Sequence, residues 1–136
     1  MFFYETTISE TYIDIFGHMN NARYLELFEQ ARWEYISQNG FGLDTIRKLQ
    51  QGPVILEVNL RYNKELKHRD KIKISVMFMQ QTGKISKIKQ EMLNEQGQVC
   101  AELLVTFGLF DLQTRKLISP TPEWLKAITP PEDRVD

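Results

Sequence analysis

Residues Tyr12 to Tyr24 read YIDIFGHMNNARY, and this stretch determines how the rest of the chain is interpreted. It contains a carboxylate at Asp14, a glycine at Gly17 and a histidine at His18, and it closes with an Asn-Asn pair before the final tyrosine. Either asparagine can cap a helix, because its side-chain oxygen accepts a backbone N–H that has no partner in the first turn. An acid, a tight turn and a helix start this close together suit a reaction centre. They equally suit an ordinary loop that leads into a helix.

A helical period begins directly after this loop. From Ala22 to Gln38 the apolar residues recur at helical spacing and form one stripe, which consists of Tyr24, Leu27, Phe28, Ala31 and Tyr35. Asn39 and Gly40 follow, and both residue types tolerate the left-handed conformation that ends many helices. An apolar face this wide on a helix of about five turns requires a broad partner, and a sheet lying across it would provide one.

The other elements are predicted to be mainly strands. Aromatic and β-branched residues predict a first strand from Phe2 to Ile8, and alternation of apolar and polar residues predicts four more. These four are expected at residues 54–63, 71–78, 85–93 and 99–109, and the one at 54–63 is expected to be half-buried. The apolar residues between Ile85 and Ile88 fall out of step, which predicts a β-bulge there.

Two short helices complete the expected elements, one from Leu43 to Gln51, ended by Gly52-Pro53, and one around Glu123 to Ala127. Short turns such as Thr82-Gly83-Lys84 link the strands, which favours antiparallel neighbours because a parallel return needs a long crossover. The sequence therefore predicts one α+β domain over residues 1–136, with a five-stranded antiparallel sheet wrapped around one long central helix.

The composition excludes several classes of protein. The 136 residues carry a formal charge of -1, whereas a general nucleic-acid binder shows a strong basic excess. The single Cys100 cannot form an internal disulfide, which fits a reducing compartment. The sequence shows neither a signal peptide nor an apolar run of the roughly 20 residues that a membrane span needs. We expect a cytoplasmic protein that binds neither nucleic acid nor a membrane.

The order of elements, combined with the motif Asp14-x-x-Gly17-His18-x-Asn20-Asn21-x-x-Tyr24, resembles the hotdog-fold thioesterases. The subgroup is that of 4-hydroxybenzoyl-CoA thioesterase and the related acyl-CoA thioester hydrolases, and the resemblance covers nearly the whole chain. Many relatives carry a second acid two residues before the catalytic one, where this chain has Tyr12.

The resemblance implies hydrolysis of acyl-CoA or acyl-carrier-protein thioesters, with Asp14 as the nucleophile or the general base. It also implies that the backbone N–H of Asn21 polarises the carbonyl, a task that suits a helix N-terminus because its free donors favour negative charge. The residues expected to contact substrate are Gly17, His18, Tyr24, Lys84 and Ser86. No metal or other cofactor is implied. The family further implies a homodimer or a homotetramer, with active sites at the subunit interface.

Each of these assignments has a purely structural alternative. Asp14 could only shape the turn. His18 could pack within the loop and form a hydrogen bond with the backbone. One asparagine could be the N-cap and the other could fix the loop conformation. Lysines in the stretches Lys64–Lys73 and Lys84–Lys89 could hold coenzyme A phosphates or merely solvate strand edges.

Three further readings concern the whole protein and its helix. The helix glutamates Glu26, Glu29 and Glu34 are expected on a solvated face, although another hotdog branch uses a helix acid. A non-catalytic acyl-CoA-binding module is the main functional alternative. A dehydratase or hydratase is disfavoured, because the local motifs of those branches do not occur around His18 or His68.

Overall fold

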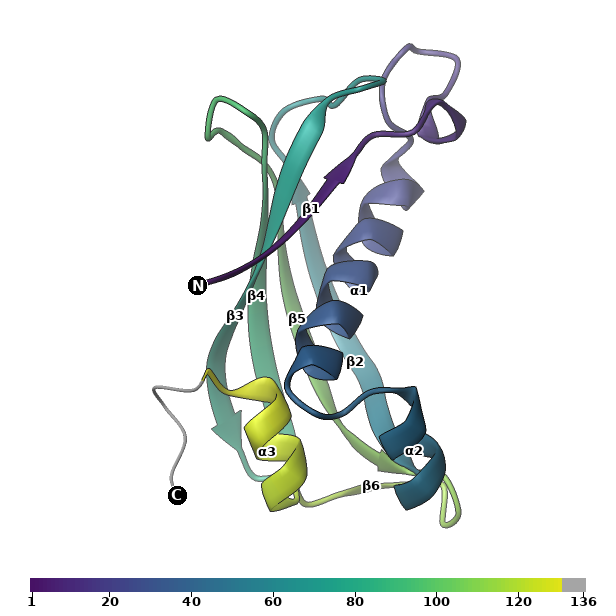
Figure 1. The fold of residues 1–136 in the computed structure, drawn as a ribbon, viewed down its shortest axis with the longest axis vertical. Coiled ribbons are helices and arrows are strands. Elements are labelled where there is room, and N and C mark those ends of the chain that lie inside the picture. The colour runs from purple at the N-terminus through teal and green to yellow at the C-terminus, as the bar shows by residue number, and fades with distance from the viewer. Residues whose placement is uncertain (131–136) are drawn as a thin grey trace.

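The long helix lies across one face of an antiparallel sheet in the computed structural model, which describes residues 1–130 (Figure 1). The strands are β1 (Phe2–Thr7), β2 (Gln51–Tyr62), β3 (Lys71–Thr82), β4 (Ile85–Leu93), β5 (Val99–Asp111) and β6 (Lys116–Ile118). The helices are α1 (Asn21–Gln38), α2 (Leu43–Leu49), α3 (Pro122–Ile128) and the 3-10 turn η1 (Glu10–Tyr12). Among these helices, none is long and apolar enough to cross a membrane.

The sheet has the order β1-β3-β4-β5-β2, and β6 pairs with the end of β5. The predicted α+β architecture is therefore confirmed, but the described sheet has six strands where five were expected. The strand that was not predicted is β6, which has three residues and is therefore too short to show an alternating pattern. β1 and β2 form the two edges of the main sheet.

Helix α1 follows the sequence prediction closely. Asn20 is the N-cap, and its Oδ1 accepts the N–H of Ala22 at 3.0 Å. At the other end Gly40 has a φ of +97°, and the N–H of Phe41 donates to Ile36 O at 2.9 Å. The core side of the helix consists of Tyr24, Leu27, Phe28, Ala31, Tyr35 and Ile36. Every member of the predicted stripe is thus buried against the sheet.

The predicted end of the second helix is wrong. α2 stops at Leu49, because Gln50 adopts a left-handed φ of 56° and the chain then turns into β2. Gly52 and Pro53 do not end a helix but pair with Phe110 and Leu109 of β5. Proline lacks a donor, and an edge strand such as β2 is where a sheet tolerates it.

The predicted bulge between Ile85 and Ile88 is also wrong. β4 alternates regularly, with Ser86, Ile88, Gln90 and Met92 buried. The register shift lies in the partner strand β3, between Phe78 and Gln80. The apolar residues of β4 fall out of step because Ser86 occupies an inward position that the pattern assigned to an apolar residue.

The strand expected at residues 54–63 was predicted to be half-buried, and this prediction is wrong for the single chain. Ile55, Leu56, Val58 and Tyr62 of β2 are 41–48% exposed. β2 lies at the edge of the sheet and pairs with β5 on one side only within residues 1–130. These apolar side chains therefore lack the neighbours that the alternating pattern implied.

Candidate active site

The loop between η1 and α1 is a tight, well-anchored turn at one end of the sheet. The N–H of Asp14 donates to His18 O at 3.1 Å, and the N–H of Gly17 donates back to Asp14 O at 3.1 Å. Gly17 has a φ of +80°, a conformation that glycine adopts at no steric cost. Met19 is buried beneath the loop, and its N–H donates to Leu66 O at 2.6 Å. The loop is thereby fixed to the segment that joins β2 to β3.

Asp14 both shapes this turn and keeps an oxygen available. Its Oδ1 accepts the N–H of Phe16 at 2.9 Å, which is an Asx turn. Within residues 1–130, the second carboxylate oxygen, Oδ2, has no hydrogen-bond partner. The half-buried side chain lines a surface cavity of about 480 Å³. The structural alternative for Asp14 is therefore compatible with a reacting carboxylate.

The first turn of α1 presents a free donor beside the same cavity. The N–H of Ala22 donates to the side chain of Asn20, and the N–H of Arg23 donates to Asn20 O at 3.0 Å. The N–H of Asn21 has no acceptor among the described residues. Asn20 and Ala22, which flank it, both line the cavity that contains Asp14. A helix N-terminus with an unused N–H is suited to an oxygen that becomes negatively charged.

A second contact holds this helix start in place. The hydroxyl of Tyr62, at the end of β2, donates to Asn21 O at 2.9 Å. Nothing in the spacing of Tyr62 indicates a hydrogen bond to a helix formed 41 residues earlier. The Tyr62 ring also packs edge-on against Tyr24, with ring centroids 5.0 Å apart.

The structure gives His18 and Tyr24 packing contacts. The His18 ring stacks on Phe16 with centroids 6.0 Å apart, and its Nδ1 lies 3.4 Å from Met19 O. Tyr24 is 3% exposed, and burial raises the pKa of its hydroxyl to about 12, so the group is neutral at physiological pH. A substrate contact for either residue stays a prediction.

Lys84 and Ser86 do not join the loop site within one chain. The loop follows Thr7, which pairs with Lys71 at the start of β3, whereas Lys84 follows the end of that strand. Twelve strand residues at about 3.3 Å each separate the two ends of β3. Ser86 is buried, and its hydroxyl is engaged by Gln81 Oε1. Any role of these two residues at the Asp14 site would require a second copy of the chain.

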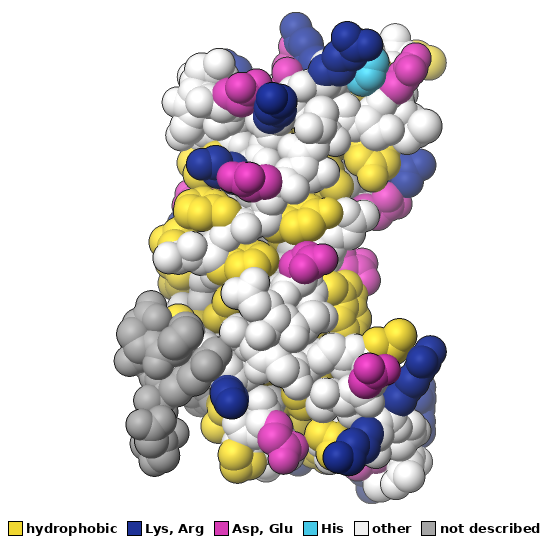
Figure 2. Space-filling model, in the orientation of Figure 1, with side chains coloured by type: hydrophobic (Ala, Val, Ile, Leu, Met, Phe, Trp, Pro, Cys, Tyr) yellow, Lys and Arg dark blue, Asp and Glu magenta, His cyan; other side chains and the backbone are white. Residues whose placement is uncertain are grey.

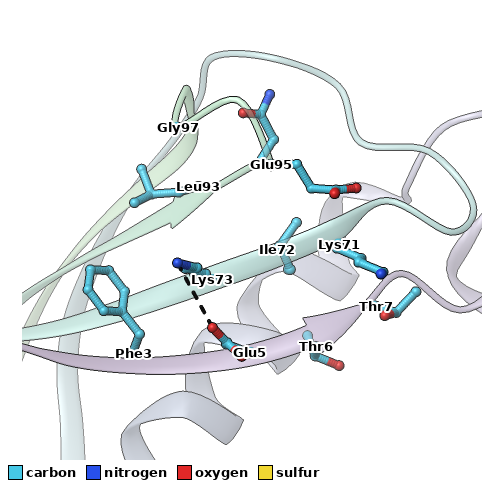
Figure 3. A pocket seen from close by; sticks show the side chains of 11 residues that line it. Phe3, Glu5, Thr6, Thr7, Lys71, Ile72, Lys73, Leu93, Glu95 and Gly97 are labelled. Atoms are coloured by element: carbon cyan, nitrogen blue, oxygen red, sulfur yellow. Dashed lines mark ion pairs between the residues drawn. The ribbon is translucent and has the colours of Figure 1, made fainter.

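A larger cavity of about 570 Å³ lies on the sheet face opposite α1, and one lysine and one glutamate in its lining form an ion pair (Figure 3). Lys73 Nζ lies 4.0 Å from Glu5 Oε1 and 5.7 Å above the ring of Phe3. The figure shows this lysine and glutamate pointing toward one another from β3 and β1. None of the loop residues 9–20 lines this cavity, so we place the candidate site at Asp14 and Asn21.

A buried polar network that the sequence did not reveal joins α1 to β4. Arg32 Nη1 donates to Gln90 Oε1 at 3.0 Å, and Gln90 Nε2 donates to Phe28 O at 3.0 Å. Gln90 is fully buried, and burial lowers the pKa of the Arg32 guanidinium. A glutamine at an inward position of an alternating strand was the signal that could have indicated this network. Within residues 1–130, no group of three or more His, Cys, Asp or Glu side chains could hold a metal ion.

An antiparallel sheet curled around one helix, with a carboxylate loop at the N-terminus of that helix, is the architecture expected of the hotdog thioesterases. The model of the thioesterase-like superfamily matches residues 9–128, and the chain belongs to this family. Its relatives include the long-chain acyl-CoA thioesterase FadM of Escherichia coli (strain K12). FadM is 32% identical over 109 residues, which are 79% of this chain and 82% of FadM.

Solved structures agree with this assignment. The YbaW probable thioesterase from Escherichia coli has a TM-score of 0.83 at 27% identity, over 94% of this chain and 98% of that one. A Staphylococcus aureus protein in complex with CoA has a TM-score of 0.88 at 18% identity, over 95% of this chain and 85% of that one. At that identity the second likeness concerns the fold alone. The expected fold and the expected thioesterase family are both confirmed.

Proposed function

We propose that this thioesterase hydrolyses acyl-CoA thioesters to a free carboxylic acid and the CoA thiol. The observation that carries the proposal is the N–H of Asn21 at the start of α1, which has no acceptor within residues 1–130 and whose neighbours Asn20 and Ala22 line the same cavity as Asp14. Similarity to FadM, named as an acyl-CoA thioesterase, supports the choice of substrate class.

The chemistry divides between these two groups. The N–H of Asn21 donates to the thioester oxygen, and this bond strengthens as the oxygen becomes an anion. Asp14 Oδ2 either takes a proton from an attacking water or attacks the carbonyl carbon itself. The first route forms a tetrahedral intermediate that expels the thiolate, which then takes up a proton. In the second route Asp14 Oδ2 forms an anhydride with the acyl group as the C–S bond breaks and the thiolate leaves; the thiolate takes up a proton, and water then cleaves the anhydride to the free acid and the Asp14 carboxylate. In both, the products are one acid and one thiol.

The function is tested by incubating the purified protein with acyl-CoA thioesters of different chain lengths and detecting free thiol. We expect turnover of at least one thioester, and parallel assays with acyl-carrier-protein thioesters identify the preferred thiol. Stabilisation by acyl-CoA without release of thiol would instead identify a non-catalytic binding module and refute the proposal.

We also propose that two copies of the chain associate through β2. The strand has a free edge, and its exposed Ile55, Leu56, Val58 and Tyr62 would be unfavourable in water. A two-fold axis beside β2 pairs the two edges antiparallel. The Lys84 end of one sheet then lies toward the Asp14 end of the other. Such a dimer, alone or within a tetramer, would let Lys84 of one copy reach a substrate bound by its partner.

This assembly predicts the effect of a charge in the interface. Val58→Asp places like charges near the two-fold axis, so we expect it to give monomers by light scattering while wild type gives a dimer or tetramer. Leu104→Asp is the matched control. Leu104 of β5 is 38% exposed and pairs with Asn59 of β2. Asn59 follows Val58 in the strand and points to the opposite face, so Leu104 faces away from Val58. A monomeric wild type, or a Val58→Asp variant that keeps the wild-type mass, would refute this interface.

A further inference from the structure

The cavity that contains Asp14 has two walls, and each wall comes from a different segment of the chain. The first wall is the segment that leads from η1 into the loop, with Thr11, Tyr12, Ile13 and Asp14. The second wall is the start of α1, with Asn20, Ala22, Arg23 and Glu26. The proposed reaction uses the carboxylate of Asp14 on the first wall and the N–H of Asn21 on the second. Its geometry therefore depends on how the two walls are held together.

Backbone hydrogen bonds attach the first wall to the residues that precede the helix. The N–H of Asn20 donates to Tyr12 O at 2.8 Å, and Ile13 forms an isolated antiparallel bridge with Met19. Within residues 1–130, no backbone hydrogen bond joins residues 11–14 to α1 itself. The position of this wall relative to the helix therefore also depends on side-chain contacts.

The side chain of Arg23 makes a contact from the helix to the first wall. Its guanidinium carbon lies 5.5 Å from the centre of the Tyr12 ring, within the roughly 6 Å over which a cation is attracted to an aromatic face. Its Nη1 donates to Glu26 Oε1 at 3.0 Å and to Glu26 Oε2 at 2.8 Å, one turn further along α1. Arg23 is thus anchored on one wall of the cavity and rests on the other.

An arginine is the residue type that can make both contacts at once. Its guanidinium is planar, so the edge donates to a carboxylate while the flat face stacks on a ring. Among the described residues that line the cavity, Arg23 is the one cation. Basic and acidic side chains lie close together at the upper end of the molecule, where α1 starts (Figure 2). We therefore interpret Arg23 through its own contacts and not as part of a broad basic surface.

These contacts matter more for geometry than for folding. The side chains of Arg23 and Glu26 are 41% and 51% exposed, and an ion pair this open to water contributes little to stability. Catalysis is more sensitive, because a misplacement of about 1 Å can lower a rate by about 10²-fold. A weak contact between the two walls can therefore have a large effect on turnover.

We propose that Arg23 is a positioning residue, which holds Tyr12, and with it Asp14, at the working distance from the N–H of Asn21. This inference rests on the proposed function for the reaction that the residue serves. Arg23 acts through the position of Asp14 and does not itself contact the reacting atoms. Glu26 orients the guanidinium so that its face meets the Tyr12 ring.

The first test measures the loop without turnover. Arg23→Met removes the charge and keeps an unbranched stem, and Tyr12→Leu removes the ring and keeps an apolar group against the core. We expect each variant to speed hydrogen exchange of the amides in residues 9–20 about two- to fivefold, the ratio that corresponds to one exposed cation–π contact. Mass spectrometry of that peptide measures the rate. Unchanged exchange in both variants would overturn the inference.

The second test measures turnover of the best acyl-CoA. We expect Arg23→Met and Tyr12→Leu each to lower kcat about tenfold with little change in KM. The double variant should be no slower than either single variant, because one contact can be lost only once. Tyr12→Phe keeps the ring face and should restore most of the rate that Tyr12→Leu loses. A rise in KM for Arg23→Met that Tyr12→Leu does not share would mean that Arg23 contacts the substrate, and would overturn the positioning role.

The chain offers a matched control at the other end of the sheet. The guanidinium carbon of Arg115 lies 5.1 Å from the centre of the Phe110 ring. Phe110 lies near the end of β5, far along the strand from Ala101, which pairs with Tyr62. Arg115→Met and Phe110→Leu remove the same kind of contact and should change neither kcat nor exchange of residues 9–20. An equal loss of kcat in the control variants would mean a general loss of stability and would contradict the proposal.

The failure of this inference and the failure of the proposed function are distinguishable. A wild-type protein that hydrolyses no acyl-CoA would refute the proposed function, whereas hydrogen exchange would still show whether Arg23 holds the loop. Wild-type turnover with an unchanged kcat in Arg23→Met would refute the positioning role alone. Circular dichroism should show the wild-type helix content for every variant, so that a loss of kcat reports geometry and not unfolding.

Discussion

Asp14→Asn is expected to reduce kcat by about 10²- to 10⁴-fold, the range typical for removal of a positioned acid or base. Asparagine keeps a side-chain oxygen in the position of Oδ1, so the hydrogen bond from the N–H of Phe16 survives and the loop should keep its shape. The amide can neither take a proton from water nor attack a carbonyl. Steady-state kinetics with the best acyl-CoA should therefore show the loss in kcat, with KM changed little.

Asp14→Ala is the useful comparison for this variant. Alanine removes the reactive oxygen and the Asx turn together, so it should lower both activity and the thermal midpoint, whereas Asp14→Asn should keep the wild-type midpoint. If Asp14→Asn retains full activity, Asp14 only shapes the turn, and another group must activate water.

Asn21→Pro is expected to reduce kcat by about 10²- to 10³-fold, the usual loss for one oxyanion donor. Proline removes the backbone N–H, which is the feature of Asn21 that the mechanism requires. The substitution should be compatible with the fold, because Asn21 is the first residue of α1 and proline is favoured at that position. The preceding Asn20 has φ -61° and ψ 138°, a conformation that a residue before proline readily adopts.

Asn21→Ala provides the control, since it removes the side chain and keeps the N–H. We expect it to retain most of the wild-type activity, and circular dichroism should show the same helix content for both variants. Equal activity of the proline and alanine variants would mean that this N–H does not contact the reacting oxygen. A loss shared equally by both variants would assign the role to the Asn21 side chain.

The local features of the loop and the helix could be predicted because they depend on neighbouring residues. Asn20 as a cap, Gly40 as a stop and the buried stripe of α1 all follow from backbone geometry and helical spacing. The bulge was predicted in β4, but the register shift lies in β3. This difference could not be predicted, because register depends on how the two strands pair. The inward position of Ser86 was hidden for the same reason.

The candidate site divides in the same way. Asp14, Gly17 and the Asn20-Asn21 pair are recognisable in sequence because they lie on one short segment. Tyr24 is part of the same motif, yet its side chain belongs to the packed interior. Lys84, assigned by resemblance, lies at the other end of the sheet from the loop, a separation that no local pattern reports.

The amino-acid order alone was enough to specify the helix, its caps, the alternating strands and the turn at Asp14, since each depends on covalent neighbours and on periods of a few residues. The exposed apolar side chains of β2 and the cavity that α1, β2 and α3 share depend on the three-dimensional arrangement. Trp33, Ile55 and Trp124 belong to α1, β2 and α3, and they line one cavity only after the sheet has folded around the helix. A cavity exists where side chains from distant segments stop short of filling space, and that depends on their final positions and not on their order along the chain.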